Sequence, residues 1–323
     1  MYIIRERKRH MEKHISKIDS IMQLLPSELA QPIGAIPQLE RMRIQEIRLR
    51  SGKFLTATVF DKEYFVRGDG KLVSTDEQAV RVSRDNVDTV MKRALQFSVH
   101  SYSKEISAGY MTVAGGCRVG FCGTAVVSRA QSVGVETVKN VSSVNIRIAR
   151  EVVGAADELM RSVFSAGLKS LLIIGVPSSG KTTVLRDLCR SLGKTNRLSV
   201  IDERNEIAAV TDGEANNDVG ILSDIFTSYE KYDAIMTAVK VMSPSVLVCD
   251  EIGSKEDMRA LEYAVNSGVK LIATTHAPDY DSAKRRSGIS KLIKDKEFDY
   301  ACVLGTGNLC GKVVRLVKIK SDD

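Results

Sequence analysis

Gly175-Val176-Pro177-Ser178-Ser179-Gly180-Lys181-Thr182 is the stretch that decides the fold of this chain. An apolar run, Leu171–Ile174, precedes it, and a helix-like stretch, Thr183–Leu192, follows it. Strand, glycine loop and helix in this order are typical of a P-loop, whose backbone N–H groups and helix N-terminus bind phosphates. The alternative is a chance glycine turn. The residues expected to bind nucleotide are Gly175, Pro177, Ser178, Ser179, Gly180, Lys181, Thr182 and Thr183, with the Thr182 hydroxyl also on Mg²⁺.

After a boundary at residues 150–155 and a helix over 158–165, apolar strands alternate with amphipathic helices. This pattern predicts a parallel sheet with crossover helices. We expect an α/β fold with a C-terminal RecA-like P-loop ATPase domain at 151–323. Two last strands would close the sheet edge around a turn at 305–311. The expected strands are 171–174, 198–201, 246–249, 271–274, 300–304 and 312–319, and the helices are 183–192, 230–241 and 255–267.

The sequence pattern of the first half of the chain predicts a smaller α+β domain at 1–150 with a basic helical start. Apolar residues recur at helical spacing over 11–25, and Ser83 is placed to cap a helix over 84–97. Short strands separated by glycine turns are expected over 44–73, and again at 115–123, 125–128 and 144–150. The glycines of this region do not spell GxGxxG, so a dinucleotide fingerprint is not expected.

The composition is that of a globular protein. The chain has 323 residues, of which 43% are hydrophobic and 27% are charged, enough for two domains. A net charge of +7 is consistent with an acidic ligand, nucleic acid or an anionic membrane face. The alternative is a solvated basic surface, because much of the charge is local, at 5–9 and 284–286.

Six cysteines show neither a CxxC pair nor zinc-finger spacing. We expect them to be buried small hydrophobes in a reducing compartment. Neither a signal peptide nor a run of 18 apolar residues is recognisable. These features predict a cytoplasmic protein, and a peripheral position at the inner face of the membrane stays open.

The apolar strand 246–249 ends in Asp250 and Glu251, which is a Walker B pattern. Asp250 would hold Mg²⁺ through water beside Thr182, and Glu251 would orient or deprotonate the attacking water. The alternative is an ordinary acidic turn at the end of a strand.

Two other strands end in polar residues. The carboxyl ends of parallel strands meet at the edge where ligands bind, so Glu203 and Glu206 are candidates for a second water-positioning group. The alternative is a surface loop paired with Arg204. His276 follows the strand 271–274 and could sense the γ-phosphate or couple it to neighbouring elements, although a lone histidine is more often structural.

Hydrolysis also needs positive charge on the far side of the γ-phosphate. Arg118, Arg147 and Arg150 lie beside glycine turns or at the end of the first domain. We expect one or more of them to complete the site of a neighbouring subunit. Surface salt bridges are the alternative for each.

Together these motifs resemble the stage III sporulation protein AA family, a sporulation branch of the ATPases of type II, type IV and pilus systems. The resemblance covers nearly the whole chain and rests on 115–123, 145–151, the P-loop, 202–208, 217–220 and 242–253. It implies a hexamer in which the amino-terminal domain contacts the next subunit's nucleotide. It also implies an acidic box at Glu203 and Glu206 and a histidine box at His276. The implied activity is an ATPase that powers a membrane-embedded channel complex between mother cell and forespore.

One stretch departs from the family pattern. After 217–220 the family tends to carry an arginine and a Cys-Pro turn, where this chain has Leu222 and Thr227-Ser228-Tyr229-Glu230. Any contact made by that stretch is therefore open.

Three functions compete on the sequence. The first is a motor that hydrolyses ATP with Mg²⁺ and works on a membrane-embedded partner. The second is a nucleic-acid-dependent RecA-like ATPase, which the charge permits, but aromatic residues are only 5% and offer no stacking platform. We therefore expect no nucleic acid partner. The third is a scaffold that binds ATP without turnover.

Overall fold

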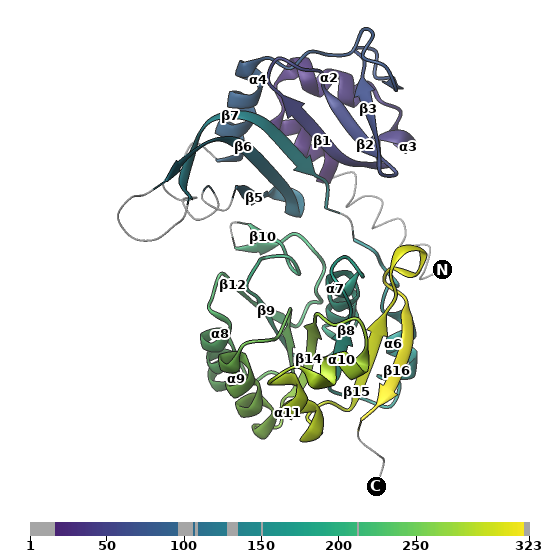
Figure 1. Ribbon diagram of the computed structural model, residues 1–323, viewed down its shortest axis with the longest axis vertical. Helices are drawn as coiled ribbons and strands as arrows, with labels where there is room; N and C mark the ends of the chain where they lie inside the picture. The colour runs from purple at the N-terminus through teal and green to yellow at the C-terminus, as the bar shows by residue number, and fades with distance from the viewer. Residues whose placement is uncertain are drawn as a thin grey trace. The chain divides into compact units, whose positions relative to one another are not determined.

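The computed structural model describes residues 17–95, 106, 109–127, 135–149, 151–211 and 213–319 (Figure 1). The chain divides into two compact units, one formed by residues 1–150 with 211–216 and the other by 151–210 with 217–323. Each unit has its own main sheet and its own hydrophobic core. The fold is the expected one, a RecA-like α/β unit that carries the P-loop and a smaller α+β unit.

The first unit is built on an antiparallel seven-stranded sheet in the order β4-β3-β2-β1-β7-β6-β5. Its strands are β1 (Ile44–Arg50), β2 (Thr56–Val59), β3 (Lys62–Val66), β4 (Leu72–Val73), β5 (Tyr110–Val113), β6 (Cys117–Val127) and β7 (Val135–Arg147). Residues 17–24 are helical, and the further helices are α2 (Ser27–Ala35), α3 (Gln38–Arg41), α4 (Arg84–Ala94) and the 3₁₀ turn η2 (Ala114–Gly116). A small hairpin, β10 (Val210–Thr211) and β11 (Glu214–Ala215), comes from later in the chain.

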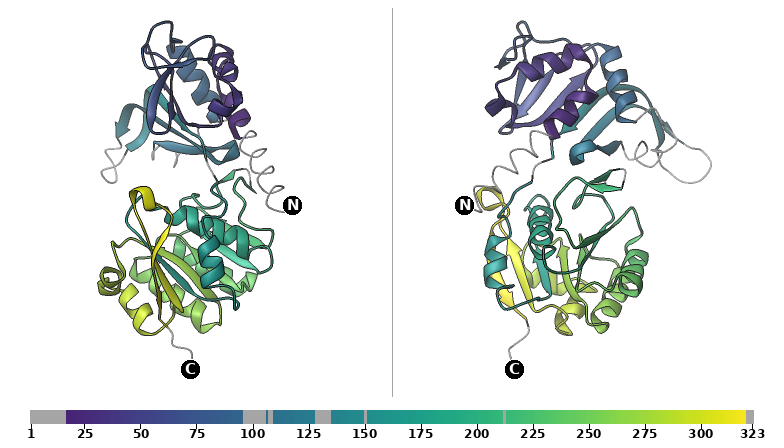
Figure 2. Two further views of the ribbon diagram at one scale, coloured as in Figure 1. Left: turned by 90° about the vertical axis from the view of Figure 1, so that its right-hand side faces the viewer. Right: turned by 180° about the vertical axis from the view of Figure 1, so that it is seen from behind.

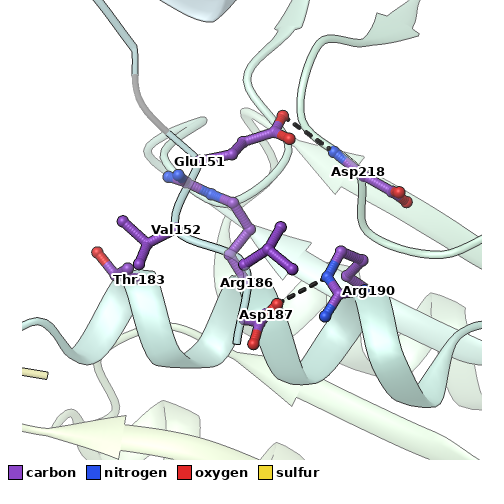
Figure 3. Close-up of a pocket in the computed structure, with 8 residues that line it drawn as sticks. Glu151, Val152, Thr183, Arg186, Asp187, Arg190 and Asp218 are labelled. Atoms are coloured by element: carbon purple, nitrogen blue, oxygen red, sulfur yellow. Dashed lines mark hydrogen bonds and ion pairs between the residues drawn. The ribbon is translucent and has the colours of Figure 1, made fainter. Parts of the chain in front are cut away.

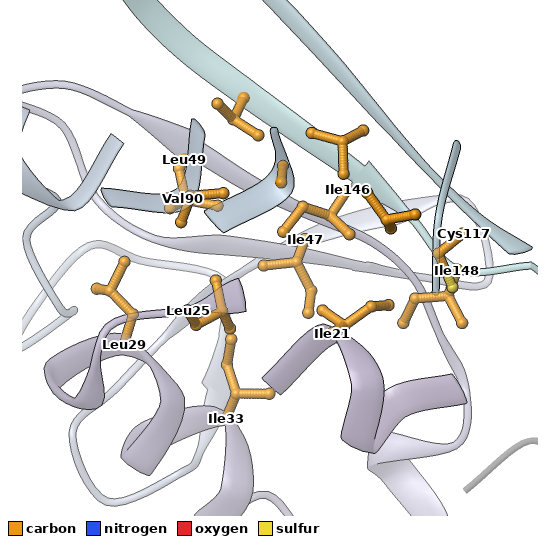
Figure 4. Close-up of a cluster of buried hydrophobic side chains, with 14 of the residues drawn as sticks. Ile21, Leu25, Leu29, Ile33, Ile47, Leu49, Val90, Cys117, Ile146 and Ile148 are labelled. Carbon is orange, nitrogen blue, oxygen red and sulfur yellow. The ribbon is translucent and has the colours of Figure 1, made fainter. Parts of the chain in front are cut away.

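One face of this sheet is buried under helices. Side chains alternate between the two faces of a strand, so β1 buries Ile47 and Leu49 while Glu46 and Arg48 lie on the opposite face. Figure 4 shows Ile21 and Ile33, from the helical segments, packed with Ile47 in this core. The helix expected over 11–25 is therefore a packing element from residue 17 on; its earlier residues lie outside the described part.

The expected N-cap of α4 is confirmed. The Ser83 hydroxyl accepts a hydrogen bond from the Asn86 N–H, and the Asn86 side chain accepts one from the Ser83 N–H. Two strands expected at 115–123 and 125–128 are a single strand, β6, and the strand expected at 144–150 is the end of the longer β7. The pairing between β6 and β7 contains bulges, where the register shifts but the two strands stay paired. The sequence pattern is interrupted at these positions, so it predicts shorter strands.

The second unit has a seven-stranded sheet in the order β12-β9-β13-β14-β8-β15-β16, parallel except for the edge strand β16. Its strands are β8 (Leu171–Ile174), β9 (Leu198–Asp202), β12 (Ser223–Thr227), β13 (Val246–Cys249), β14 (Lys270–Thr275), β15 (Tyr300–Leu304) and β16 (Val313–Lys318). Its helices are α6 (Asp157–Ser162), α7 (Lys181–Leu192), α8 (Lys231–Thr237) with the π-helical η3 (Ala238–Met242), α9 (Lys255–Asn266), α10 (Tyr280–Arg285), α11 (Ile289–Lys294) and the 3₁₀ turn η4 (Gly307–Leu309).

Helices cover both faces of this sheet (Figure 1, Figure 2). In β13, Leu247 and Cys249 face the core under α8, α9, α10 and α11, while Val246 and Val248 face the core under α6 and α7. A strand buried on both faces has no side chains that face solvent, so its sequence is a continuous run of apolar residues. That is why the four central strands were readable from the sequence.

Three elements of the second unit were not expected. The edge strand β12 pairs in parallel with β9, but only Phe226 in it is buried, so its sequence lacks an apolar run. The short helices α10 and α11 each have six residues, too few for a clear helical period.

Within the described part of the chain, no helix combines the length and the apolar character needed to cross a membrane.

A close approach of two backbone segments gives a stability prediction. Gly220 has φ +92°, and a Cβ there would lie 2.6 Å from the Cα of Gly193, at the end of α7. Gly268 has φ +82° with open space around it. We expect Gly268→Ala to cost about 1–2 kcal/mol from backbone strain alone. Gly220→Ala should cost about 3 kcal/mol or more because steric overlap adds to the strain.

Urea unfolding of the two variants measures this difference in the free energy of unfolding. An equal loss of unfolding free energy in the two variants would show that the segments at Gly193 and Gly220 separate easily.

Candidate active site

The P-loop links β8 to α7 at the carboxyl edge of the parallel sheet. Ser178 and Gly180 have φ +61° and +87°, left-handed conformations that turn the chain tightly between strand and helix. Residues 175–180 thus form a compact loop that ends where the first turn of α7 presents its N–H groups. Such a turn at a helix N-terminus is a ready-made anion site.

The turn between β15 and β16 holds the P-loop from outside. The Gly311 N–H donates to the Ser179 carbonyl at 2.9 Å, and the Cys310 thiol donates to the Ser178 carbonyl at 3.2 Å. Sequence reasoning placed a turn at 305–311 but saw no role for it. The position of this turn beside the P-loop depends on the pairing of β15 with β8, and the local sequence does not reveal that pairing.

Two P-loop side chains have unusual surroundings. The Ser179 hydroxyl is buried and makes no hydrogen bond within the described residues. The Lys181 ammonium donates to the carbonyls of Gly175 and Val176, both at 2.9 Å. Burial lowers the pKa of Lys181, and the carboxylates of Asp250 and Glu251 oppose that shift.

A chain of polar contacts joins Lys181 to the strand ends beside it. Lys181 Nζ lies 3.0 Å from His276 Nδ1, and His276 Nε2 lies 3.4 Å from Glu251 Oε1. An ammonium has only donors, so Nδ1 must be the acceptor, and Nε2 then carries the hydrogen that faces Glu251. The other oxygen of Glu251 pairs with Arg204 at 3.1 Å. His276 therefore couples the P-loop lysine to the carboxylate at the end of β13.

Asp250 lies between the P-loop helix and β14. Its Oδ2 is 3.4 Å from the Thr182 hydroxyl, and its Oδ1 accepts from the Thr274 hydroxyl at 2.9 Å. Thr274 was not among the expected site residues, but it follows from the same rule, because it lies near the carboxyl end of the neighbouring strand β14. A hydroxyl and a carboxylate this close are oxygen ligands of the type that Mg²⁺ prefers.

The loop after β9 is braced by its first acid. The buried Asp202 carboxylate accepts hydrogen bonds from the N–H groups of Glu206, Ile207 and Ala208 at 2.8–3.1 Å. Burial raises the pKa of Asp202, and these hydrogen bonds oppose the shift. Arg186 of α7 donates to the carbonyls of Glu206 and Ile207. Asp202 is thus a structural anchor that fixes the loop carrying Glu203 and Glu206.

Two charged residues of this loop pair with residues of other segments. Arg204 pairs with Glu251, which follows the end of β13, and Glu203 pairs with Lys231 at 3.3 Å.

The candidate arginines Arg118 and Arg147 belong to the first unit, where they are direct cross-strand neighbours on β6 and β7. Arg147 Nε lies 3.3 Å from Glu46, and its side chain is 65% exposed. The Arg118 guanidinium lies 4.5 Å from the centre of the Tyr110 ring. Arg150 lies outside the described residues.

A shallow pocket opens beside α7 in the second unit (Figure 3). Thr183, Arg186, Asp187 and Arg190 line it from the helix, with residues 151–153 and Asp218 opposite. Arg190 is fixed by a 2.7 Å ion pair with Asp187, and the Asp218 N–H donates to Glu151. The enclosed space of this pocket is only about 10 Å³, room for about one water molecule, so by itself it is not a small-molecule site.

The comparisons with known proteins agree with the motifs. A family model described as sporulation stage III, protein AA, matches residues 15–322. This chain belongs to that family. A curated relative, stage III sporulation protein AA of Bacillus subtilis (strain 168), is 31% identical over 288 residues, which cover 87% of this chain and 89% of the relative. The resemblance drawn from the sequence is confirmed.

Solved structures show the fold of this member of the stage III sporulation protein AA family. The ATPase DotB of Yersinia pseudotuberculosis aligns with a TM-score of 0.56 at 14% identity, covering 92% of this chain and 81% of that chain. The pilus retraction motor PilT with bound ADP aligns with a TM-score of 0.51 at 13% identity, covering 81% of this chain and 74% of that chain. At these identities the likeness concerns the fold alone.

The expectation that all six cysteines are buried is wrong for two of them. Cys117, Cys189, Cys249 and Cys302 are buried, but Cys122 and Cys310 are exposed. Both exceptions lie where the strand pattern breaks: Cys122 is at a bulge of β6, and Cys310 is in the turn after β15. Burial raises the pKa of the Cys249 and Cys302 thiols to about 12, so they hold almost no reactive thiolate at neutral pH.

Thiol labelling tests this arrangement. We expect N-ethylmaleimide to modify Cys122 and Cys310 in the folded protein and the other four only after unfolding, as peptide mass mapping would show. An adduct on Cys310 removes its hydrogen bond to the P-loop, so amide exchange over 176–180 should become faster. Cys310→Ser should abolish that effect of labelling and Cys122→Ser should leave it. Unchanged exchange after Cys310 modification would show that the turn does not hold the loop.

Proposed function

We propose that this chain is an ATPase that hydrolyses ATP to power a membrane-associated secretion or channel complex. The observation that carries the proposal is the polar chain from Lys181 through His276 to Glu251, beside the pair of Thr182 and Asp250. It links a phosphate-binding lysine to a carboxylate able to act on water. The fold shared with DotB and PilT supports it.

The P-loop residues fit a nucleotide and its metal. The buried Ser179 hydroxyl has no hydrogen-bond partner among the described residues, and a bound phosphate would provide one. Thr182 and Asp250 would hold Mg²⁺, directly and through water. Mg²⁺ bound there would neutralise the charge of the phosphate oxygens.

The strand-end residues then have separate tasks. Glu251 accepts hydrogen bonds and can orient or deprotonate the attacking water. His276 senses phosphate, because Lys181 must loosen its contact with His276 to reach a phosphate oxygen. Glu203 and Glu206 lie on the braced loop after β9 and act as the second water-positioning group.

We also propose that residues 1–150 and 151–323 act as two domains of a hexamer, in which Arg118, Arg147 or Arg150 completes the site of a neighbouring subunit. The exposure of Arg147 leaves it accessible to such a neighbour. The partners of the assembled protein would be membrane-embedded channel proteins, with the motor cytoplasmic or peripheral at the inner membrane face, and no nucleic acid.

Phosphate release, measured against protein concentration, tests the hydrolase. Lys181→Ala should weaken ATP binding, because it removes the cation beside the phosphates. Glu251→Gln should keep ATP binding but lower turnover by roughly 10²- to 10⁴-fold, the usual contribution of a general base. Turnover per chain should rise with concentration if sites are shared.

The matched controls are Lys291→Ala and Glu262→Gln. These two residues form a surface ion pair with 2.6 Å between Lys291 Nζ and Glu262 Oε1, and neither belongs to the P-loop or to the strand ends beside it. ATP binding without turnover at every concentration would contradict the hydrolase and favour the scaffold. Turnover that depends on added single-stranded DNA or RNA and falls steeply with salt would favour the nucleic-acid-dependent ATPase.

The arginine proposal has its own test. Arg147→Ala should lower kcat at saturating ATP by roughly 10³-fold or more, as for other arginines that complete phosphoryl-transfer sites. Arg84→Ala, also an exposed arginine of the first unit, is the control. If Arg147→Ala mixed with Glu251→Gln chains regains turnover, the arginine acts between subunits. An unchanged kcat would rule Arg147 out.

A further inference from the structure

Lys231, the first residue of α8, belongs to none of the motifs described above, yet its side chain is only 12% exposed. Burying a lysine is costly unless its charge is paired and its hydrogens are bonded. It directly follows Glu230, the last residue of the stretch where the chain departs from the family pattern. Its surroundings therefore need an explanation from this structure.

Three acceptors from separate segments surround the ammonium group. Lys231 Nζ donates to the Glu251 carbonyl at 2.6 Å and pairs with the Glu203 carboxylate at 3.3 Å. The Asp257 carboxylate, in the capping box of α9, lies 3.9 Å away. An ammonium group has three hydrogens, which matches these three neighbours. One side chain thus ties together the end of β13, the loop after β9 and the start of α9.

The contact with Glu251 falls on a strained residue. Glu251 has φ +35°, a left-handed conformation that costs a non-glycine residue about 1–3 kcal/mol and persists only when its surroundings enforce it. Its N–H donates to the Thr274 hydroxyl at 2.9 Å and to Asp250 at 3.0 Å. Its carbonyl is the group that Lys231 binds. Both backbone groups of Glu251 are therefore anchored, the N–H by β14 and the carbonyl by Lys231.

We propose that Lys231 is a positioning residue, which holds Glu251 in its strained conformation and Glu203 beside it so that both carboxylates face the reacting water. The proposal rests on the proposed ATPase function. Lys231 acts through the backbone carbonyl of one glutamate and the carboxylate of the other. Without it, the Glu251 peptide can relax, and the carboxylate leaves its position next to His276.

The test compares Lys231→Met with Lys231→Arg in steady-state ATP hydrolysis. A displacement of about 1 Å at a catalytic group costs about 10²-fold, so Lys231→Met should lower kcat by roughly tenfold to a hundredfold. The KM for ATP should change by less than about threefold, because the P-loop contacts are intact. Lys231→Arg should restore most of kcat, since arginine keeps the charge and donors. Lys291→Met removes the same charge from the surface pair with Glu262 and should leave both parameters unchanged.

A combined variant separates positioning from general support of the fold. If Lys231 acts through the two glutamates, adding Lys231→Met to a chain that already carries Glu251→Gln and Glu203→Gln should lower kcat by less than about twofold further, because both carboxylates that it positions are already gone. A full additional loss in the combined variant would overturn the proposal. So would a rise in KM and a lower melting temperature that Lys231→Arg does not restore, because Lys231 would then only support the fold.

The outcomes also distinguish this inference from the proposed function. If the unaltered protein hydrolyses ATP and Lys231→Met has the same kcat, the positioning role alone is overturned. An unaltered protein that binds ATP without turnover at any concentration would overturn both.

Discussion

The burial of the parallel sheet on both faces is the constraint on which the rest of the second unit depends. Strands such as β8 and β13 have no solvent-facing side, so every residue in them is apolar and polar residues are confined to the strand ends. Because the strands are parallel, those ends meet at one edge. Asp202, Asp250 and Thr275 with His276 therefore gather beside the P-loop, which leaves β8 at the same edge.

Gathering so many polar groups in a partly buried place creates an electrostatic cost, and the structure offsets it by specific pairing. The Asp202 carboxylate accepts hydrogen bonds from backbone N–H groups, and Asp187 forms an ion pair with Arg190. Lys231 pairs with Glu203 and donates to the Glu251 carbonyl. Such pairs contribute little net stability relative to apolar packing, but removing one partner leaves a buried charge. They are better understood as fixing the positions of the loops that surround the P-loop, most directly at Glu251, whose left-handed backbone is anchored from two sides.

The first unit follows a different rule. In the described part of this unit, helices pack on one face of the antiparallel sheet, and the other face of β1, β7 and β6 is polar. Arg118 and Arg147 stand opposite each other across two strands, an arrangement that is unfavourable for like charges. Glu46 offsets part of that repulsion by accepting from Arg147, Arg48 and Asn145.

The sequence by itself determined the elements whose residues must repeat or must occupy special conformations. The P-loop, the four central strands, the cap at Ser83 and the acidic end of β13 were predictable, because phosphate binding, two-sided burial and capping each require particular residues at fixed spacing. The edge strand β12 and the helices α10 and α11 were not, because one-sided burial and short length leave no period. Tertiary structure alone decided which strand ends lie side by side, and so the contacts of Lys181 with His276, of Cys310 with the P-loop, and of Lys231 with Glu251. These contacts join residues 20 to 132 positions apart, and sheet order, which local sequence does not encode, brings them together.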